Sequence, residues 1–530
     1  MTVSWARPRR FLTSVLVVVI GLVFAGPLIY LVLRSLELGG RLGEFLTDPS
    51  TWVPLGRTVL LAAAVGTSTA VVGTAMAWLV VRTDLPGRRV LRVLAPLPLV
   101  LPSFVGATAL LAGLTPGGLV SELLAPIGIE SLPRLEGFWG SWFVLTLFTY
   151  PLVYLPVAAR LATLPSSLEE SARMLGRTAP AVAREVLLPQ AATSVAAGAL
   201  LVVLYTISEF GVVSLLRYGT LTQQIYQAKL DPTSWLPLSL VLAVLAVAVT
   251  AGERVVARRS RTIAVGRGRQ GRPLPLGRWR WPAAAAVVFL LANALIGPLA
   301  VLAYWAVRGY TADSAATSLS LEPGELVTPA LSTIGVSVAA AVLAVAVVLP
   351  VARSVGRRRS RVGHAASVMI VAGYALPGLV VALSMVFWSL SSDPAAVLYQ
   401  TVPLLVMAYA IHFGAQAMRT AQVAVEGVPG RMEDAARMLG ASAWRRLTVV
   451  EVPIMLPGLV AGAGLVMVSA MKELPATLVL SPPGFSTLAT TIWDAYEFGS
   501  YAQMGVAGLV LVAVSGTLTW ALVIRRAELL

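Results

Sequence analysis

The sequence predicts an all-α polytopic membrane protein with about twelve transmembrane helices, arranged as two parallel six-helix repeats. Composition is the first reason, because 57% of the 530 residues are hydrophobic and only 12% are charged, far outside the range of soluble proteins. The second reason is a set of apolar segments of spanning length, and the third is a polar segment that occurs twice. Cysteine is absent, which excludes disulfides, thiolate metal sites and iron–sulfur clusters.

Twelve apolar segments are each long enough, at about 20 residues, to cross a bilayer as a helix. Proline and glycine break the third segment (Pro96, Pro98, Pro102) and the ninth (Pro377, Gly378). The first segment is too long for a cleaved signal peptide and has no clear cleavage site, so we expect it to be a span. The segments lie near 11–33, 58–81, 93–114, 138–160, 190–216, 235–256, 282–306, 330–352, 367–390, 398–419, 454–480 and 502–524.

Basic residues between the segments predict the orientation. With both termini placed in the cytoplasm, the inside segments hold 30 arginines and the outside segments hold seven basic residues. The net charge of +15 is therefore mostly a topology signal, and we expect the lipid bilayer, not nucleic acid, as the partner of this charge.

Two lobes of six spans follow from this topology, namely 1–256 and 282–530, joined by a basic cytoplasmic linker at 257–281. An even number of spans gives both lobes the same orientation, so the repeat is parallel. The linker is rich in Arg, Gly and Pro, which is typical of a flexible tether that also meets anionic lipid; a regulatory role is the alternative. The outside loops are too short to fold as a domain, so capture of a solute in solution would fall to another chain.

The duplicated polar segment covers 164–189 and 428–453, here called the first and second repeated loops. Ten of the 26 aligned residues are identical at a constant offset of 264. Each copy predicts helix, turn, helix: acids lie in the first turn, Gly176 and Gly440 suit a left-handed C-cap, and Thr178 and Ser442 suit the next N-cap. A single copy would fit an amphipathic helix on the membrane surface equally well, but two copies in register favour a docking element.

The repeated loops resemble the cytoplasmic EAA loops of ABC importer permeases. Ser171 replaces the first alanine of the pattern in one copy, and an aspartate replaces its glutamate in the other. The resemblance implies the type I ABC importer permease fold and a multi-pass protein of the bacterial plasma (inner) membrane. It also implies two ATP-binding cassette subunits docked on the cytoplasmic face and an extracytoplasmic solute-binding protein. The residues that would couple to the ATPase are Glu170, Ala172, Gly176, Asp434, Ala436 and Gly440.

A single acid follows each repeated loop within the next apolar segment: Glu209 in the first half and Glu473, again 264 residues later. A carboxylate near the bilayer interior costs about 2.5–3.5 kcal/mol on insertion scales, so it usually faces a cavity or a partner. Both could be pathway residues. Equally, they could be structural, as helix-end acids or as members of an interhelical ion pair, with Lys472 close by.

Two stretches, Ser208–Tyr226 and Lys472–Trp493, resemble the matching segments of the fused ferric-iron permeases, which implies ferric iron as the solute. Thiamine permeases share this layout, and phosphonates and polyamines are carried by similar proteins. From the residues alone, an ion-coupled secondary transporter that uses Glu209 and Glu473 is an alternative from another class.

No constellation for enzyme chemistry is present in the sequence. A P-loop requires a lysine directly after its glycine, and neither Lys229 nor Lys472 has that context, so we expect ATP hydrolysis on a separate chain. The only histidines, His364 and His412, lack metal-ligand spacing. We therefore expect no catalytic residues, no metal site and no cofactor on this chain.

Overall fold

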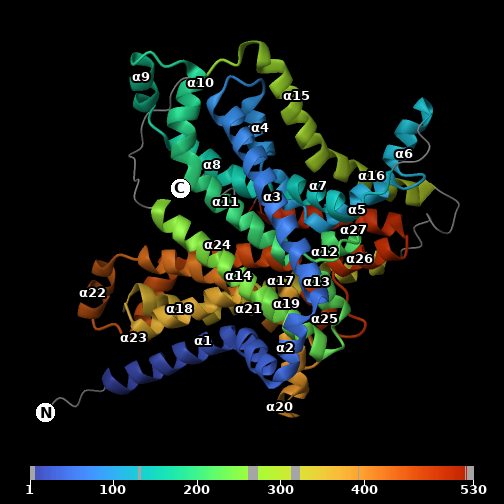
Figure 1. Ribbon diagram of the computed structural model, residues 1–530. Helices are drawn as coiled ribbons and strands as arrows, with labels where there is room; N and C mark the ends of the chain where they lie inside the picture. Colours follow the sequence, from blue (N-terminus) through green and yellow to red (C-terminus); the bar gives the residue numbers. More distant parts are fainter. Residues whose placement is uncertain are drawn as a thin grey trace. The chain divides into compact units, whose positions relative to one another are not determined.

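The computed structural model describes residues 6–128, 133–260, 273–311, 323–357, 359–391, 393–519 and 521. Within these residues the chain is built of helices (Figure 1), and the only β-type pairing is one isolated parallel bridge between Thr83 and Leu274. The predicted all-α class is confirmed.

Ten helices of the described chain are long and apolar enough to cross a membrane, or up to eleven with one bent pair. The bent pair joins Arg361–Gly373 to Gly378–Leu390 at 105°, at the predicted break around Pro377. The remaining predicted span, 398–419, corresponds to α21 (Val402–Glu426), a 25-residue helix that contains His412, Gln416 and Arg419 and is not among those candidates. Every predicted apolar segment thus has a helical counterpart.

The chain divides into two compact units. One comprises residues 44–319 and 495–509, and its long helices α3, α8, α11 and α14 pack against one another (Figure 1). Its helices are α3 (Pro49–Arg82), α4 (Arg88–Leu94), η1 (Leu97–Val100), α5 (Ser103–Leu114), α6 (Leu119–Leu124), η2 (Ala125–Ile127), α7 (Gly137–Thr149), α8 (Pro151–Thr163), α9 (Ser166–Met174), α10 (Ala179–Val182), η3 (Ala183–Leu187), α11 (Leu188–Ser208), α12 (Gly211–Leu215), α13 (Leu221–Gln227), α14 (Pro232–Ser260), η4 (Gly277–Trp279), α15 (Arg280–Leu291), η5 (Ala292–Ile296) and α16 (Gly297–Thr311).

The other unit comprises residues 1–43, 320–494 and 510–530, and α17, α21 and α24 form its centre. Its described helices are α1 (Ala6–Glu37), α17 (Pro323–Gly356), α18 (Arg361–Gly373), α19 (Gly378–Leu390), α20 (Asp393–Ala396), α21, α22 (Gly430–Met438), α23 (Ala443–Arg445), η6 (Arg446–Glu451), α24 (Val452–Met471) and α25 (Pro475–Leu480). Three helices run across the division: α2 (Gly40–Thr47), α26 (Leu488–Glu497) and α27 (Tyr501–Thr519).

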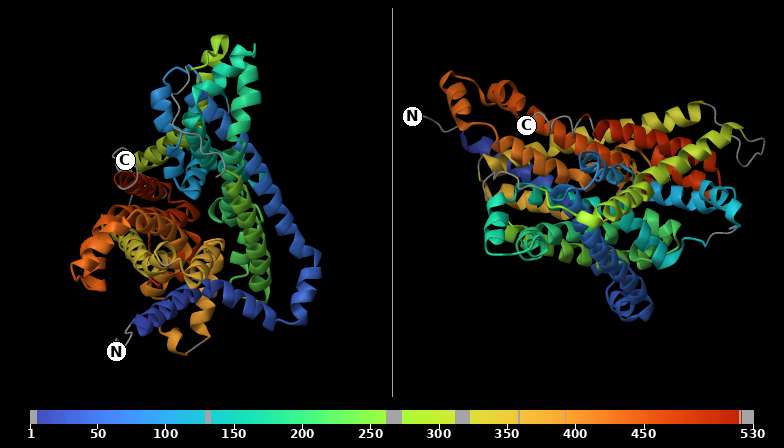
Figure 2. Two further views of the ribbon diagram at one scale, coloured as in Figure 1. Left: turned by 90° about the vertical axis from the view of Figure 1, so that its left-hand side faces the viewer. Right: turned by 90° about the horizontal axis from the view of Figure 1, so that it is seen from above.

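The first helix of each half packs with helices of the other half. Helix α1 lies along α18 and α19 (Figures 1 and 2). Glycines permit close approach there: a Cβ at Gly21 would meet Ala366 at 3.1 Å, and one at Gly373 would meet the Phe24 carbonyl at 2.8 Å. Likewise α16 packs on α5, with Gly113 against Val301. The compact units are therefore discontinuous along the chain, and the lobe boundaries drawn from span order, 1–256 and 282–530, stay a prediction.

Candidate functional site

Both repeated loops fold as helix, turn, helix, as their sequence predicts. Two residues beyond the end of α9 and of α22 lies a glycine in the left-handed region, with φ of +81° at Gly176 and +77° at Gly440. The next amide reaches back across the turn: Arg177 donates to the Ala172 carbonyl and Ala441 to the Ala436 carbonyl, at 3.1 and 3.0 Å. This is the Schellman pattern. Nothing lies within 4 Å of a Cβ at either glycine, so the backbone angle alone requires glycine.

Each loop presents the same side chains to its surroundings. The alanine of the pattern faces inward, with Ala172 8% and Ala436 9% exposed. The methionine and leucine that follow are 83–89% exposed in both copies. Glu170 and Asp434 are exposed as well. The two loops therefore offer one acid and two large apolar side chains in matching positions; these exposed apolar residues are Met174, Leu175, Met438 and Leu439.

The chain after each glycine differs in one respect from the prediction. Ser442 caps the next helix as expected, its hydroxyl accepting from the Arg445 amide at 3.2 Å, and α10 begins directly after Thr178. Both copies then pass through a π-helical turn, η3 and η6, before the long helix starts. Sequence reasoning missed these turns because no periodicity in so short a segment signals one extra residue per turn.

The repeated loops are anchored differently. Glu169 at the start of α9 lies 2.7 Å from Arg82, the last residue of α3, and the two side chains are only 6% and 5% exposed. The geometry at Arg82 Nη2 does not meet the angles of a hydrogen bond, so the pair is held by electrostatic attraction between the two opposite charges. Glu433, the equivalent of Glu169, instead forms a longer contact of 3.4 Å with Arg437 on its own helix, which is 61% exposed.

In the second half, two arginines at the C-terminal end of α17 anchor the second repeated loop. Arg357, which lies 275 residues after Arg82, donates to the Val428 carbonyl at 2.7 Å. Arg353 binds the buried Glu451 carboxylate at 2.7 Å. Residue 187 of the first half, the equivalent of Glu451, is leucine. Arginines recur between the second and third predicted spans of each half, but the sequence does not indicate which group each of them contacts.

Glu209 and Glu473 cap equivalent short helices. Glu209 directly follows α11 and accepts from the Val212 amide of α12 at 3.0 Å, while Glu473 accepts from the Ala476 amide of α25 at 3.2 Å. The carbonyls of both acids also accept a threonine hydroxyl, from Thr222 and Thr477. The structure thus places both as helix-end acids, one of the two alternatives that the sequence leaves open. Capping does not exclude contact with a solute, so a pathway role stays a proposal.

The surroundings of the two acids are not the same. Ser103 donates to Glu209 at 3.0 Å, whereas the second half has Gly378 at the matching place after Leu-Pro. A Cβ at Gly378 would stand 2.4 Å from Glu473 Oε1 and 3.4 Å from His412 Nε2. His412 is also stacked with Tyr374 at 6.1 Å between ring centroids, so it packs with an aromatic ring beside the acid.

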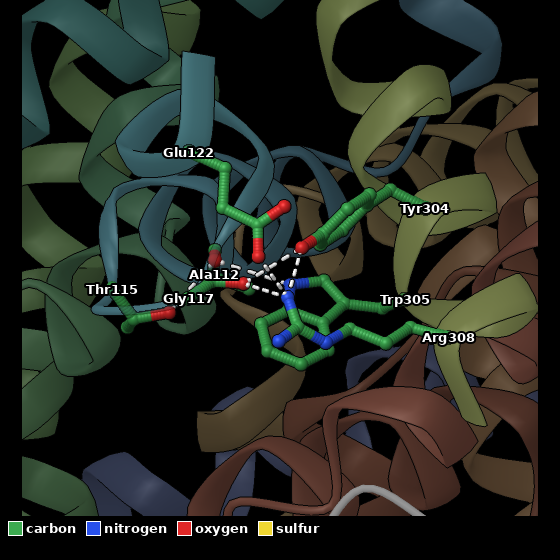
Figure 3. Close-up of polar contacts among 7 residues, drawn as sticks. All are labelled: Ala112, Thr115, Gly117, Glu122, Tyr304, Trp305 and Arg308. Carbon is green, nitrogen blue, oxygen red and sulfur yellow. Dashed lines mark hydrogen bonds and ion pairs between the residues drawn. The ribbon is translucent and has the colours of Figure 1, made fainter. Parts of the chain in front are cut away.

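A polar cluster fastens α16 to the turn between α5 and α6 (Figure 3). Arg308 donates to the Gly117 carbonyl at 2.7 Å and also binds Glu122 and the Tyr304 hydroxyl. Trp305 donates to the Ala112 carbonyl at 3.1 Å. Glu122, Tyr304 and Arg308 also line a surface pocket. Sequence reasoning used Arg308 only as an outside charge and did not foresee this contact between distant segments.

No group of three or more His, Asp or Glu side chains is close enough to hold a metal ion within the described ranges. His364 and His412 lie on different helices, α18 and α21. The expectation that the chain carries no cofactor or metal stays a prediction.

Comparison with known proteins identifies the family. The model described as "Binding-protein-dependent transport system inner membrane component" matches twice, over residues 70–262 and 348–526. Together these matches cover well over half of the chain, and each contains one repeated loop. The chain belongs to this family. It is a permease of binding-protein-dependent ABC transport, a multi-pass membrane protein and a transport subunit.

Relatives of this permease carry several names. It is 30% identical over 521 residues to the Fe(3+)-transport system permease protein FbpB 2 of Haemophilus influenzae, a match that covers 96% of this chain and 97% of the relative. The sulfate transport system permease protein CysT of Synechococcus elongatus is 28% identical over 35% of this chain and 63% of its own. A putative 2-aminoethylphosphonate transport system permease protein of Salmonella paratyphi A is 37% identical over 16% of this chain and 32% of its own.

Proposed function

We propose that this permease is the membrane subunit of an ATP-driven importer of ferric iron delivered by an extracytoplasmic binding protein. One observation supports docking on ATP-hydrolysing subunits. Both repeated loops expose a methionine and a leucine at the same positions, Met174–Leu175 and Met438–Leu439, close to an alanine that is buried. Apolar side chains of this size stand exposed on a polar loop where a partner covers them. The iron part is supported by the similarity to the iron permease along nearly the whole chain.

In this proposal each repeated loop docks on one ATP-binding cassette subunit, which hydrolyses ATP on a separate chain. The inward-facing Ala172 and Ala436 allow α9 and α22 to pack closely, and Gly176 and Gly440 fix the turn that presents the exposed side chains. Glu170 and Asp434 remain available for polar contacts with the partner. The Schellman turns support this arrangement because they make each loop rigid before it binds.

The proposed orientation places both termini and both repeated loops in the cytoplasm of a bacterium, with the permease in its plasma membrane. The excess of arginine on that side supports it. The binding protein would then meet the segments predicted to lie outside, which include Gly117 and Arg308.

Glu209 and Glu473 are proposed to shape the pathway. Each carboxylate caps the start of a short helix, α12 or α25, directly after a long helix, α11 or α24, has ended. Each therefore stabilises a break between two helices. Breaks of this kind expose backbone groups that can line a polar cavity. Alternating access would then follow from movement of the repeated loops when ATP closes the partner subunits.

The test is uptake of radiolabelled ferric iron and radiolabelled thiamine by cells with and without the permease, at limiting solute. Loss of iron uptake alone in the deletion strain supports the proposal. Loss of thiamine uptake alone overturns iron as the solute and leaves the transport machinery in place. Uptake into vesicles that lack any ion gradient must require ATP; uptake that follows a proton or sodium gradient without ATP would make the chain a secondary transporter.

A further inference from the structure

The segment that leads from the linker into α15 is bound to the chain at the end of α3. Residues 273–276 read Pro-Leu-Pro-Leu, and Leu274 pairs with Thr83 in the isolated parallel bridge. The Leu274 amide donates to the Arg82 carbonyl at 2.8 Å, and its carbonyl accepts from the Asp84 amide at 3.1 Å. Leu274 is 6% exposed, so this end of the linker is docked.

The sequence of this segment suits its contacts. Proline has no amide hydrogen, so the four residues have two backbone donors, and both are used: the second, Leu276, donates to Asp84 Oδ1 at 2.8 Å. Proline also restricts the residue before it to extended conformations. Leu274, which precedes Pro275, is therefore held in an extended conformation before it docks, which lowers the conformational entropy that docking removes.

Arg82 connects this segment to the first repeated loop. Its carbonyl accepts from Leu274, while its guanidinium lies 2.7 Å from Glu169 at the start of α9. One residue therefore touches the linker with its backbone and the loop with its side chain. Thr83 beside it is 1% exposed and its hydroxyl donates to the Leu79 carbonyl, so the chain here has little room to shift.

The second half lacks this arrangement in the part of the chain that the structure describes. Arg357, which directly follows α17, donates to the Val428 carbonyl near α22, and Arg353 binds Glu451 beyond α22, so neither holds an acid in the first turn of α22. The bridge at Thr83 is the only one among the described residues. The linker contact is therefore a feature of the first repeated loop.

We propose that residues 273–276, here called the linker clamp, position the first repeated loop for its ATPase partner by fixing Arg82. This inference rests on the proposed ATP-driven function and adds to it a path by which movement of α9 reaches the linker. A displacement of α9 is passed through Glu169 and Arg82 to Leu274, six residues before α15 begins. The linker clamp thus joins the first repeated loop mechanically to the first span of the second half, instead of tethering two lobes passively.

Two matched pairs of variants in the complete, reconstituted transporter test the linker clamp. Leu274→Pro removes the amide that binds Arg82, and Leu274→Ala keeps it; Asp84→Ala removes the acceptor for Leu276, and Asp84→Asn keeps an acceptor oxygen. We expect the amount of ferric iron moved per ATP hydrolysed to fall several-fold in Leu274→Pro and Asp84→Ala. This ratio should stay close to the wild-type value in the two control variants, Leu274→Ala and Asp84→Asn. Equal ratios within both pairs would overturn the proposal.

A double-mutant cycle separates positioning from general stability. If the linker clamp acts through the ion pair, Leu274→Pro should lower the transport-to-hydrolysis ratio no further once Glu169→Gln is present. Combined with Glu433→Gln in the second repeated loop, its effect should be additive. Additive behaviour with Glu169→Gln would show that the clamp does not act through Arg82.

Amide hydrogen exchange of the full-length permease without its partner subunits tests the linker clamp independently of whether the transporter is driven by ATP. A wild-type complex with no ATP-dependent uptake would refute the proposed function only. In Leu274→Pro, amides of α9 should exchange about fivefold faster or more than in Leu274→Ala, the effect of losing about one hydrogen bond. Unchanged exchange in α9 would refute the clamp, whatever the complex does.

Discussion

The same substitution in the two repeated loops should have very different effects. Glu169 and Glu433 are identical residues, 264 apart, in the first turn of equivalent helices. Replacing Glu169 by alanine leaves the Arg82 guanidinium, 5% exposed, without its counter-charge. Breaking a buried ion pair from one side costs about 3–5 kcal/mol. Replacing Glu433 removes a contact to a side chain that is 61% exposed. Such helix pairs contribute about 0.3–0.5 kcal/mol.

The difference of about 3 kcal/mol corresponds to about a hundredfold in the equilibrium between docked and undocked α9. We would measure it on the purified full-length permease in lipid nanodiscs, by hydrogen exchange of α9 and α22 together with thermal unfolding. Glu169→Ala should expose α9 to exchange and lower the unfolding temperature, while Glu433→Ala should leave α22 and the temperature nearly unchanged.

A second variant shows whether the unpaired charge is the cause. Arg82→Met combined with Glu169→Met replaces the pair by apolar side chains of similar length, which is often neutral or stabilising for a buried pair. The double variant should regain most of the protection that Glu169→Ala loses. Equal losses in Glu169→Ala and Glu433→Ala, or a double variant as damaged as the single one, would refute the reasoning.

Three further predictions concern the turns, the exposed side chains and the capping acids. Gly440→Ala forces a β-carbon into the left-handed region at a cost of about 1–2 kcal/mol, and Gly440→Pro should release the ATPase subunit in co-purification; retention of the subunit by both would count against docking. Met438→Asp should also weaken co-purification but leave thermal unfolding of the isolated permease unchanged, because the side chain is 89% exposed; a large drop in unfolding temperature would contradict this. Ser103→Ala leaves the Glu209 carboxylate one donor short, so unfolding should become easier by about 1–3 kcal/mol, measured by denaturant titration; no change would show that another donor takes its place.

Local features of the fold could be predicted from the sequence because they depend on neighbouring residues. The positive φ at Gly176 and Gly440, the cap at Ser442 and the bend at Pro377 each follow from the conformational limits of one or two residues. The spans follow from apolar length in the same way. These features are short-range, so a single sequence contains all the information that they require.

Contacts between distant segments could not be predicted in this way. Nothing near Glu169 indicates that its partner is Arg82, and nothing near Leu274 indicates that it pairs with Thr83. The packing of α1 with helices of the second half also depends on tertiary shape, through small residues such as Gly21. The prolines around Leu274 were visible, but composition alone made this segment look like a flexible tether.

The two repeated loops are alike where they face outward and different where they are held. The exposed methionine and leucine, the inward alanine and the left-handed glycine are the same in both copies, which is what the proposed binding to two like ATPase surfaces requires. The anchors differ, with a buried ion pair and the linker clamp in one half and two arginine contacts in the other. An anchor has only to hold its loop, so several chemistries suffice, whereas a docking surface must match its partner. Equivalent substitutions should therefore have similar effects on partner binding and unequal effects on the stability of each loop.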